Sequence, residues 1–332
     1  MSILWEKTWL NYLLLPLAFV FRGFMFLRSQ LQATLYSKKN PRYPIPVVVI
    51  GNLTVGGSGK TPLVIAIAQF LQRTGWRPGI ISRGYKGKAK SYPCRVNTNS
   101  HPREVGDEAL LLARQSNCPV VVDPKRNRAV RHLLARSNCN VILSDDGLQH
   151  FSLTGNIEII SIDGQRRFGN GFCLPAGPLR ESLVRLKTAD FIVAKDKHLS
   201  AEFKMELVPA YFYQLTSPHN QQQPSFFADK RLHAVAGIGH PKQFFDRLKA
   251  MGLNVVTHPF PDHHLFKAND FNYGKEAIIL LTEKDAVKCQ YLADARIWCL
   301  KTSTILDPAF LEALSQKITK INDSLRSSLG SL

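Results

Sequence analysis

Residues 54–61 form a glycine-rich string, T-V-G-G-S-G-K-T, that lies between a short apolar run and an amphipathic one. Glycines in such a loop let backbone N–H groups turn inward around phosphate oxygens, where a Cβ atom would block the approach. The strict pattern has glycine at the first position, where this chain has Thr54, yet the flanking runs fit a strand before and a helix after. The alternative is a glycine-rich turn with an unrelated lysine, and this context disfavours it.

We therefore expect a loop that binds a nucleotide. Lys60 would reach the β- and γ-phosphates, which makes it a catalytic candidate as well, and the hydroxyl of Thr61 would ligate Mg²⁺. The residues expected to contact the nucleotide are Thr54, Val55, Gly56, Gly57, Ser58, Gly59, Lys60 and Thr61.

Two adjacent carboxylates, Asp145 and Asp146, follow an apolar run in the string V-I-L-S-D-D-G-L-Q-H. In a P-loop fold the end of such a strand lies beside the phosphate loop, so either carboxylate can bind Mg²⁺ directly or through water. Without the P-loop, Asp-Asp-Gly would indicate an ordinary turn. The elements that select guanine, Asn-Lys-x-Asp and Thr-Lys-x-Asp, do not occur, and T-E-K-D at residues 282–285 has the wrong order. ATP is therefore expected rather than GTP.

Short apolar runs alternate with turns and longer amphipathic stretches from Pro41 onwards, which is typical of a parallel sheet with crossover helices. The polar, proline-flanked residues 217–224 have the composition of a linker or surface loop. We therefore predict an α/β fold, with a P-loop NTPase-like α/β/α sandwich over residues 29–216 and a second, smaller α/β domain over residues 217–332. Strands are expected at 47–50, 79–81, 120–122, 141–143, 157–161, 191–194, 232–238 and 277–281, with a further strand around Val255, and helices at 63–72, 241–251 and 308–318.

The first 28 residues contain tryptophans, leucines and phenylalanines, and Arg22 interrupts the apolar run. The run is short for a membrane span, which needs roughly 20 apolar residues. It also lacks the charged start and the cleavage site of a signal peptide. We expect a helix that lies on a membrane surface, where basic residues meet anionic headgroups: Arg22, Arg28, Lys38, Lys39 and Arg42. A helix packed on the protein's own core is the alternative.

The chain of 332 residues has a formal net charge of +18, so its surface attracts polyanions such as nucleic acid, anionic lipid or a phosphorylated substrate. The basic residues do not form dense tracts with interleaved aromatics, and no helix-turn-helix, zinc-finger or RNP-like pattern occurs. A nucleic-acid partner is therefore not expected. The six cysteines contain no C-x-x-C pair, which argues against a zinc ribbon or a disulfide framework and favours a reducing cytosol.

Seven strings in this order closely resemble the tetraacyldisaccharide 4'-kinase family. They extend over nearly the whole chain, and together they are far more specific than any one of them. They are V-G-G-S-G-K-T-P (55–62), S-R-G-Y (82–85), V-G-D-E-A (105–109), D-D-G-L-Q-H (145–150), P-A-G-P-L-R-E (175–181), F-P-D-H-H (260–264) and T-E-K-D-A-V-K (282–288).

The resemblance implies an enzyme that transfers the γ-phosphate of ATP, with Mg²⁺, to the 4'-hydroxyl of the tetraacyldisaccharide 1-phosphate precursor of lipid A. It implies two α/β/α domains with the active site in the cleft between them. It also implies a monotopic, peripheral protein at the cytoplasmic face of the bacterial inner membrane, whose partners are the acylated disaccharide lipid and the cytoplasmic leaflet. No protein partner is predicted.

Carried over by position, Asp107 of V-G-D-E accepts the proton of the attacking hydroxyl, and His263 of F-P-D-H-H is its partner from the second domain. A carboxylate oriented by an imidazole suits this role, because a sugar hydroxyl is a poor nucleophile. Asp107 could instead cap the helix that follows it. The neighbouring His264 is the alternative to His263, and a zinc site at this motif lacks further ligands at a matching spacing.

The remaining strings supply donors suited to the phosphate and sugar hydroxyls of the acceptor, because guanidinium binds phosphate in a bidentate manner. Arg126 is a further candidate of this kind, although ordinary surface solvation is equally consistent with it and with Arg128. Glu181 is a candidate for binding the metal or organising water, whereas the role of residues 282–288 stays open between a turn that starts a helix and a nucleotide contact. The candidates for substrate binding are Arg83, Arg128, Gln149 and Arg180, and those for the metal are Thr61, Asp145, Asp146 and Glu181.

Two other classes of function remain possible on the residues alone. One is a kinase or ligase for a small cytosolic molecule, which would stay soluble and active without residues 1–28. The other is a P-loop switch of the metallochaperone type, which would hydrolyse nucleotide slowly and phosphorylate no acceptor.

Overall fold

The computed structural model describes residues 5–37, 43–150, 153 and 155–329. Its strands are β1 (Val47–Gly51), β2 (Pro78–Ser82), β3 (Cys94–Val96), β4 (Val120–Val122), β5 (Val141–Asp145), β6 (Ile157–Asp163), β7 (Phe191–Lys195), β8 (Phe203–Gln214), β9 (Ser217–Gln222), β10 (Leu232–Ala236), β11 (Val255–Pro259), β12 (Ile278–Thr282) and β13 (Ile297–Leu306). Its α-helices are α1 (Trp9–Leu13), α2 (Leu15–Ser37), α3 (Lys60–Arg73), α4 (Pro102–Val105), α5 (Asp107–Ser116), α6 (Arg126–Arg136), α7 (Pro241–Ala250), α8 (Glu283–Cys289) and α9 (Pro308–Leu329).

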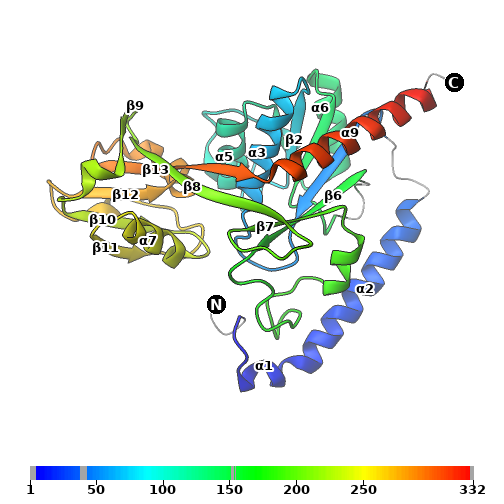
Figure 1. Ribbon diagram of the computed structural model, residues 1–332, viewed down its shortest axis with the longest axis horizontal. Helices are drawn as coiled ribbons and strands as arrows, with labels where there is room; N and C mark the ends of the chain where they lie inside the picture. Colours follow the sequence, from blue (N-terminus) through cyan, green and yellow to red (C-terminus); the bar gives the residue numbers. More distant parts are fainter. Residues whose placement is uncertain (1–4, 38–42, 151–152, 154, 330–332) are drawn as a thin grey trace.

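In the described part of the chain, these strands form a single 13-stranded sheet (Figure 1). Its order is β11-β10-β12-β13-β8-β7-β6-β1-β5-β2-β4-β3, and β9 pairs with β8 outside this path. Most neighbours are parallel, as the alternation of short apolar runs and amphipathic stretches predicts. The predicted fold class, α/β with a P-loop NTPase-like arrangement, is confirmed.

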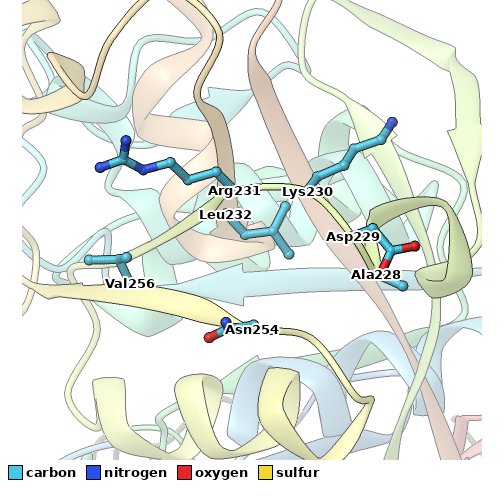
Figure 2. A pocket seen from close by; sticks show the side chains of 7 residues that line it. All are labelled: Ala228, Asp229, Lys230, Arg231, Leu232, Asn254 and Val256. Atoms are coloured by element: carbon cyan, nitrogen blue, oxygen red, sulfur yellow. The ribbon is translucent and has the colours of Figure 1, made fainter.

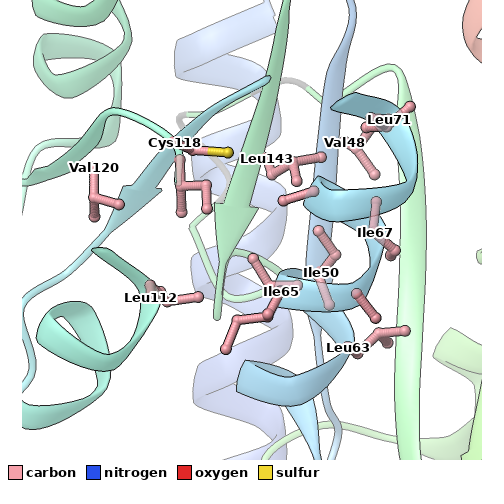
Figure 3. Packing of buried hydrophobic residues seen from close by; sticks show 14 of the residues in the cluster. Val48, Ile50, Leu63, Ile65, Ile67, Leu71, Leu112, Cys118, Val120 and Leu143 are labelled. Carbon is pink, nitrogen blue, oxygen red and sulfur yellow. The ribbon is translucent and has the colours of Figure 1, made fainter. Parts of the chain in front are cut away.

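The strand that carries the glycine-rich loop, β1, lies between β5 and β6, with Ile50 level with Asp145 of β5. Every residue of β1 is buried, because helices cover both faces of this part of the sheet. On one face α3, α5 and α9 pack against the strands, through residues such as Leu63 and Leu112 (Figure 3). On the other face α6 contributes Ala129, Val130 and Leu133. The carboxyl ends of β1 and β5 are thereby fixed side by side.

Strands β10 to β13 form the second half of the sheet, with α7 on one face and α8 on the other. The antiparallel pair of β8 and β13 joins the two halves, and a bulge interrupts its register between Pro209 and Tyr211, a place where a strand tolerates proline. The interpretation of residues 217–224 as a linker is wrong for most of that segment. Residues 217–222 are strand β9, which pairs with β8 although nearly all of it is exposed.

Helix α9 follows the second half in sequence but packs on the first. Phe310, Leu314 and Ile318 are fully buried in the same core cluster as the residues of α3. Lys317 of α9 also forms an ion pair with Asp190, just before β7. The domain boundaries 1–28, 29–216 and 217–332 stay a prediction, and the packing of α9 joins the end of the third segment to the core of the second.

The N-terminal helices have two contrasting surfaces. α1 is fixed to the loop after β6, because the buried side chain of Asn11 donates to the carbonyl of Ala176 at 2.9 Å and Tyr12 packs edge-on against Phe172. α2 instead leaves apolar side chains more than half exposed: Leu17, Phe19, Val20, Phe24, Leu27 and Leu31. The alternative of a helix packed on the protein's own core does not hold for these residues.

Of the basic residues expected to face headgroups, Arg22 is exposed. The side chain of Arg28 and residues Lys38, Lys39 and Arg42 lie outside the described part of the structure. No helix within the described ranges is long and apolar enough to span a bilayer.

Candidate active site

The glycine-rich loop, which the sequence predicts to bind phosphate and which is called the phosphate loop below, leads directly into α3, which begins at Lys60. Gly59 has a φ of +85°, a conformation that side chains with a Cβ rarely adopt, so glycine is required there. Asn52 holds the loop from within. Its fully buried side chain donates to the carbonyl of Thr54 at 2.7 Å and accepts from Nζ of Lys60 at 2.8 Å. The loop is therefore braced by its own protein contacts.

Lys60 and four predicted site residues form one polar network. Asp146 accepts from Nζ of Lys60 at 3.0 Å and from Nη1 of Arg180 at 3.2 Å. Gln149 donates to Oε1 of Glu181 at 2.7 Å and lies 3.4 Å from Arg180. Burial alone would raise the pKa of Asp146, but the two cations outweigh it and hold the pKa well below its usual range. Asp146 is thus an ionised carboxylate beside the phosphate loop.

The environment of Asp145 raises the pKa of its carboxyl, in contrast to that of Asp146. It is buried at the end of β5, where Oγ of Ser82 donates to its Oδ2 at 3.3 Å and its Oδ1 has no hydrogen-bond partner among the described atoms. Burial, followed by the negative charges of Glu108 and Asp146, raises the pKa of Asp145 to about 7. An unpaired buried carboxylate oxygen fits a site that a divalent cation completes.

Arg126, at the start of α6, is buried beside this carboxylate. Its Nη2 donates to the backbone carbonyl of Asp145 at 2.7 Å, whereas Nε and Nη1 are buried without partners among the described atoms. Burial lowers the pKa of Arg126 to about 10, so the guanidinium still carries its charge at neutral pH. Unsatisfied guanidinium donors are costly to bury, and phosphate oxygens are suitable acceptors for them.

Asp107 and His263 meet across the two halves of the molecule. Nδ1 of His263 lies 2.9 Å from Oδ2 of Asp107, and both side chains are nearly buried. Burial would raise the pKa of Asp107, but the hydrogen bond from His263 and the charge of Lys284 outweigh it and lower the pKa. The neighbouring His264 pairs instead with Asp270 at 2.9 Å. The structure therefore distinguishes the two histidines, and only His263 faces the carboxylate.

Close backbone packing sets the start of α5, where Asp107 is the first residue. Gly106 has a φ of +88°, and a Cβ there would come within 2.7 Å of the carbonyl of Tyr85. The ring of Tyr85 in turn packs against His263, with centroids 5.4 Å apart. The strings S-R-G-Y and V-G-D-E thus pack against each other beside the Asp107–His263 pair. Gly106, rather than Asp107, occupies the N-cap position of α5. Asp107, at the first helical position, accepts from the N–H of Glu108 through Oδ1, and its Oδ2 faces His263.

A second contact between the halves lies at the phosphate loop itself. Gly239, between β10 and α7, is so close that a Cβ there would lie 3.7 Å from the backbone nitrogen of Gly57. Arg166, after β6, donates to the carbonyl of Gly57 and contacts His240. Burial, together with the charge of Arg166, lowers the pKa of His240 to about 4, so that histidine is neutral at physiological pH.

A family model described as tetraacyldisaccharide-1-P 4'-kinase matches residues 10–319 of the chain. The chain belongs to this family. A tetraacyldisaccharide 4'-kinase of Nitrosococcus oceani is 50% identical over 272 residues, which cover 80% of this chain and 79% of that protein. One from Coxiella burnetii (strain RSA 331) is 44% identical over 315 residues, which cover 95% and 93%. The solved structure of LpxK from Aquifex aeolicus in complex with ATP superposes with a TM-score of 0.78 at 28% identity, covering 93% of this chain and 99% of that one.

These relationships confirm that the protein is a kinase that acts on a hydroxyl group, and they confirm the family resemblance of the seven strings. The structure brings eight of the predicted site residues into two adjoining groups. The first is the network of Lys60, Asp146, Gln149, Arg180 and Glu181, with Asp145 beside it. The second is the pair of Asp107 and His263. Glu108, which follows Asp107 in α5, connects the two groups, because its negative charge acts on Asp145.

Two of the four residues predicted to bind the substrate lie outside both networks. Arg128 forms an ion pair with Asp123 at 2.5 Å and is nearly half exposed, so its described contact is a structural one. Arg83 is exposed, and its charge acts on Arg126. No group of three or more histidine, cysteine or acidic residues that could hold a metal ion is found in the described ranges. The four metal candidates therefore do not form a ready-made protein cage, and Mg²⁺ does not require one, because it uses one or two carboxylates together with phosphates and water.

Sequence reasoning missed two residues that organise the kinase site. Asn52 braces the loop, and its only sequence signal is a polar residue directly between an apolar strand and the glycines. Lys284 lies within the string T-E-K-D-A-V-K, whose role the sequence left open. Its Nζ is 3.0 Å from Oε1 of Glu108.

The cavity of about 460 Å³ in Figure 2 lies at the other end of the strands from this site. Leu232 and Val256 line it, and both lie at or next to the amino ends of their strands, β10 and β11. Ligands of open α/β sheets bind beyond the carboxyl ends of the strands, where the phosphate loop and His263 lie. The cavity is therefore not part of the candidate active site.

Proposed function

We propose that this kinase transfers the γ-phosphate of ATP to the 4'-hydroxyl of an acylated disaccharide 1-phosphate, with Asp107 accepting the hydroxyl proton and His263 orienting that carboxylate. The family and the names of its relatives support the reaction. The observation that supports the residue roles is the contact at 2.9 Å between Asp107 and His263, which come from segments 156 residues apart. Such a contact brings a carboxylate from one half and an imidazole from the other to the same point.

The chemistry follows from the state of the carboxylate. Because its pKa is lowered, Asp107 is ionised at neutral pH and can accept a proton. The sugar oxygen forms a new bond to the γ-phosphorus, the bond from that phosphorus to the β-γ bridging oxygen breaks, and ADP leaves with the electron pair. The hydroxyl proton passes to Asp107. The N–H of Glu108 donates to Oδ1 of Asp107 at 3.0 Å, and this bond, with that of His263, fixes the orientation of the carboxylate.

The residues near the phosphate loop fit a bound Mg²⁺ ion. Thr61, Asp145 and Asp146 would hold it, and Glu181, which is bonded to Gln149, would organise water near it. When bound, Mg²⁺ neutralises charge on the phosphates being transferred. The unpaired Oδ1 of the buried Asp145 supports this assignment. Lys60 contributes the same kind of charge from the protein, since its ammonium lies within 3.0 Å of Asp146 and can turn to a phosphate.

The acceptor is assigned to the basic residues around this network. Arg180 lies beside Gln149 and Asp146, and Arg126 has two buried donors without partners, so both can bind phosphate or hydroxyl oxygens of the lipid. Arg83 and Arg128 remain candidates for the edge of the site. Arg128 would have to exchange its ion pair with Asp123 for the lipid.

The exposed apolar residues of α2 support attachment to the cytoplasmic leaflet of the bacterial inner membrane. Phe19, Val20 and Phe24 are each more than 60% exposed, and a surface of this kind is stabilised when it enters the boundary between headgroups and acyl chains. The net charge of +18 favours an anionic leaflet. A lipid acceptor would then reach the site without leaving the membrane.

The test is to incubate the protein with γ-labelled ATP, Mg²⁺ and the acylated disaccharide 1-phosphate in detergent micelles, and to separate lipid from free phosphate. Label on the lipid, lost when Mg²⁺ is chelated, is expected. Release of labelled phosphate with none on the lipid would instead identify a nucleotide-hydrolysing switch and contradict the proposal.

A further inference from the structure

The string T-E-K-D-A-V-K forms the end of β12 and the start of α8. Thr282 caps the helix, because its hydroxyl accepts from the backbone N–H of Asp285 at 3.1 Å. Glu283, the first residue of α8, accepts from Gln115 of α5 and from Lys301 of β13 at 2.8 Å. The start of α8 is therefore held rigidly against α5, whose first residue is Asp107.

Within α8 a buried ion pair forms hydrogen bonds with the backbone of a single glycine, Gly237. Nζ of Lys288 lies 2.7 Å from Oδ1 of Asp285, and both side chains are almost completely buried. Asp285 accepts from the N–H of Gly237 at 3.2 Å, and Lys288 donates to the carbonyl of Gly237 at 3.0 Å. A buried ion pair is poor evidence of stabilisation, because removing two charges from water offsets their attraction. Its geometric effect here is clear, since it fixes both polar groups of Gly237.

The same glycine is hydrogen-bonded to the backbone of His263. The carbonyl of Gly237 accepts from the N–H of His263 at 3.1 Å. His263 has a φ of +64°, which is uncommon for a residue with a Cβ and persists only where the surroundings enforce it. The ion pair of α8 thus fixes Gly237, Gly237 fixes the backbone of His263, and that backbone directs the imidazole toward Asp107.

Lys284 provides a second and more direct link. Its Nζ lies 3.0 Å from Oε1 of Glu108 and 3.6 Å from Oδ1 of Asp262. Glu108 follows Asp107 in sequence, and Asp262 precedes His263. One ammonium therefore binds the carboxylate next to each member of the pair. Burial would lower the pKa of Lys284, but these carboxylates and Asp107 outweigh it and raise the pKa, so the lysine stays charged.

We infer that residues 282–288 are a positioning element for the Asp107–His263 pair, and that Lys284 is the residue that joins the two segments carrying it. The inference rests on the proposed roles of Asp107 and His263. Lys284 acts through Glu108 and Asp262 and not by direct contact with ATP or the acceptor. Its charge also keeps Asp107 ionised. The groups that lower the pKa of Asp107 are His263 from the loop after β11 and Lys284 and Lys288 from α8. The acidic groups next to them are Asp262, which lies near His263 and Lys284, and Glu108, which pairs with Lys284.

The test compares Lys284→Met with Lys301→Met in the full-length protein. Lys301 is a matched control, because it also pairs with a carboxylate of this region, Glu283, but that carboxylate is held by Gln115 and Thr302 as well. We expect Lys284→Met to lower kcat by about 10- to 100-fold, the scale of a misplaced reacting group, with the KM for ATP within about twofold. Lys301→Met should stay within about twofold of the wild type in both.

Two further readouts separate positioning from a general loss of structure. The acidic limb of the pH profile of kcat/KM should move to higher pH in Lys284→Met, because a cation that lowers the pKa of Asp107 is gone. Lys284→Arg should restore most of kcat and the wild-type limb. If Lys284→Met does not fold, Glu108→Gln replaces it. That variant removes the carboxylate that links Lys284 to the segment of Asp107, so it should lower kcat. It also removes a negative charge next to Asp107, so the acidic limb should move the opposite way, to lower pH.

Equal losses in Lys284→Met and Lys301→Met, or an unmoved acidic limb, would overturn the inference. Asp107→Asn, measured in parallel, distinguishes this failure from failure of the proposed function. An inactive Asp107→Asn beside an unaffected Lys284→Met refutes only the positioning element. Full activity of Asp107→Asn refutes the proposed roles themselves.

Discussion

Replacing Asp107 with asparagine tests the assignment of the proton acceptor most directly. The amide has nearly the size of the carboxylate, and its oxygen can still accept from the N–H of Glu108, which lies 3.0 Å from Oδ1. Its NH2 group then takes the place of Oδ2, which lies 2.9 Å from Nδ1 of His263. Asparagine cannot accept a proton. The substitution therefore removes the chemistry and leaves the packing at the start of α5 largely unchanged.

The expected size of the effect follows from the state of the carboxylate. A positioned general base contributes about 100- to 10,000-fold to a rate. The lowered pKa of Asp107 makes it a weak base, so the lower part of that range applies. We expect kcat to fall about 100-fold, which corresponds to about 2.7 kcal/mol of activation free energy. ATP affinity should change by less than about twofold, because the phosphate loop is held by Asn52 and not by Asp107.

The assay measures initial rates of label transfer to the micellar lipid at saturating ATP, with nucleotide affinity determined separately. Asp270→Asn is the matched control, since Asp270 forms the same kind of pair with His264 at the same distance of 2.9 Å, away from Asp107. It should retain near-normal kcat. Turnover of Asp107→Asn within about threefold of the wild type would refute the role of this carboxylate as the proton acceptor.

Three further outcomes are expected. Lys60→Ala should weaken ATP binding and lower kcat together, as measured by nucleotide titration and by turnover, because the same ammonium would bind the phosphates in the ATP complex and in the transition state. With metal chelated, the thermal stability of the wild type should fall as pH rises from about 4, the pKa of an unfolded aspartate, to about 7, the raised pKa of Asp145, and this fall should be absent in Asp145→Asn. Replacing Phe19, Val20 and Phe24 together with serine should reduce sedimentation with anionic vesicles without lowering the unfolding temperature, because these side chains are exposed.

The parts of the site that are local in sequence could be predicted from the sequence. The glycine-rich loop, the strand before it and the helix after it occupy one stretch, and their spacing is set by the backbone chemistry of phosphate binding. The position of Asp145 beside the loop also follows, because parallel strands end at the same edge of a sheet. The structure has Ile50 and Asp145 level with each other, as this reasoning requires.

The features that could not be predicted depend on contacts between distant segments. Nothing local to residues 217–222 indicates a strand, because they are polar and exposed and pair only through their backbone with β8. The meeting of Asp107 with His263 required the family resemblance, since no periodicity connects residues so far apart. The role of Lys284 was hidden for the same reason. Its partners lie in two other strings, and a lysine in the first turn of a helix normally indicates a solvated surface.

Glu108 connects the two chemical parts of the site, and its position explains why their carboxylates behave differently. It lies next to Asp107 and pairs with Lys284, whose charge lowers the pKa of Asp107. The negative charge of Glu108 also raises the pKa of Asp145. Carboxylates whose environments push their pKa values apart can take different roles at one pH. The start of α5 therefore keeps Asp107 ionised and able to accept a proton, and it leaves Asp145 as the carboxylate that gains most from a neighbouring cation.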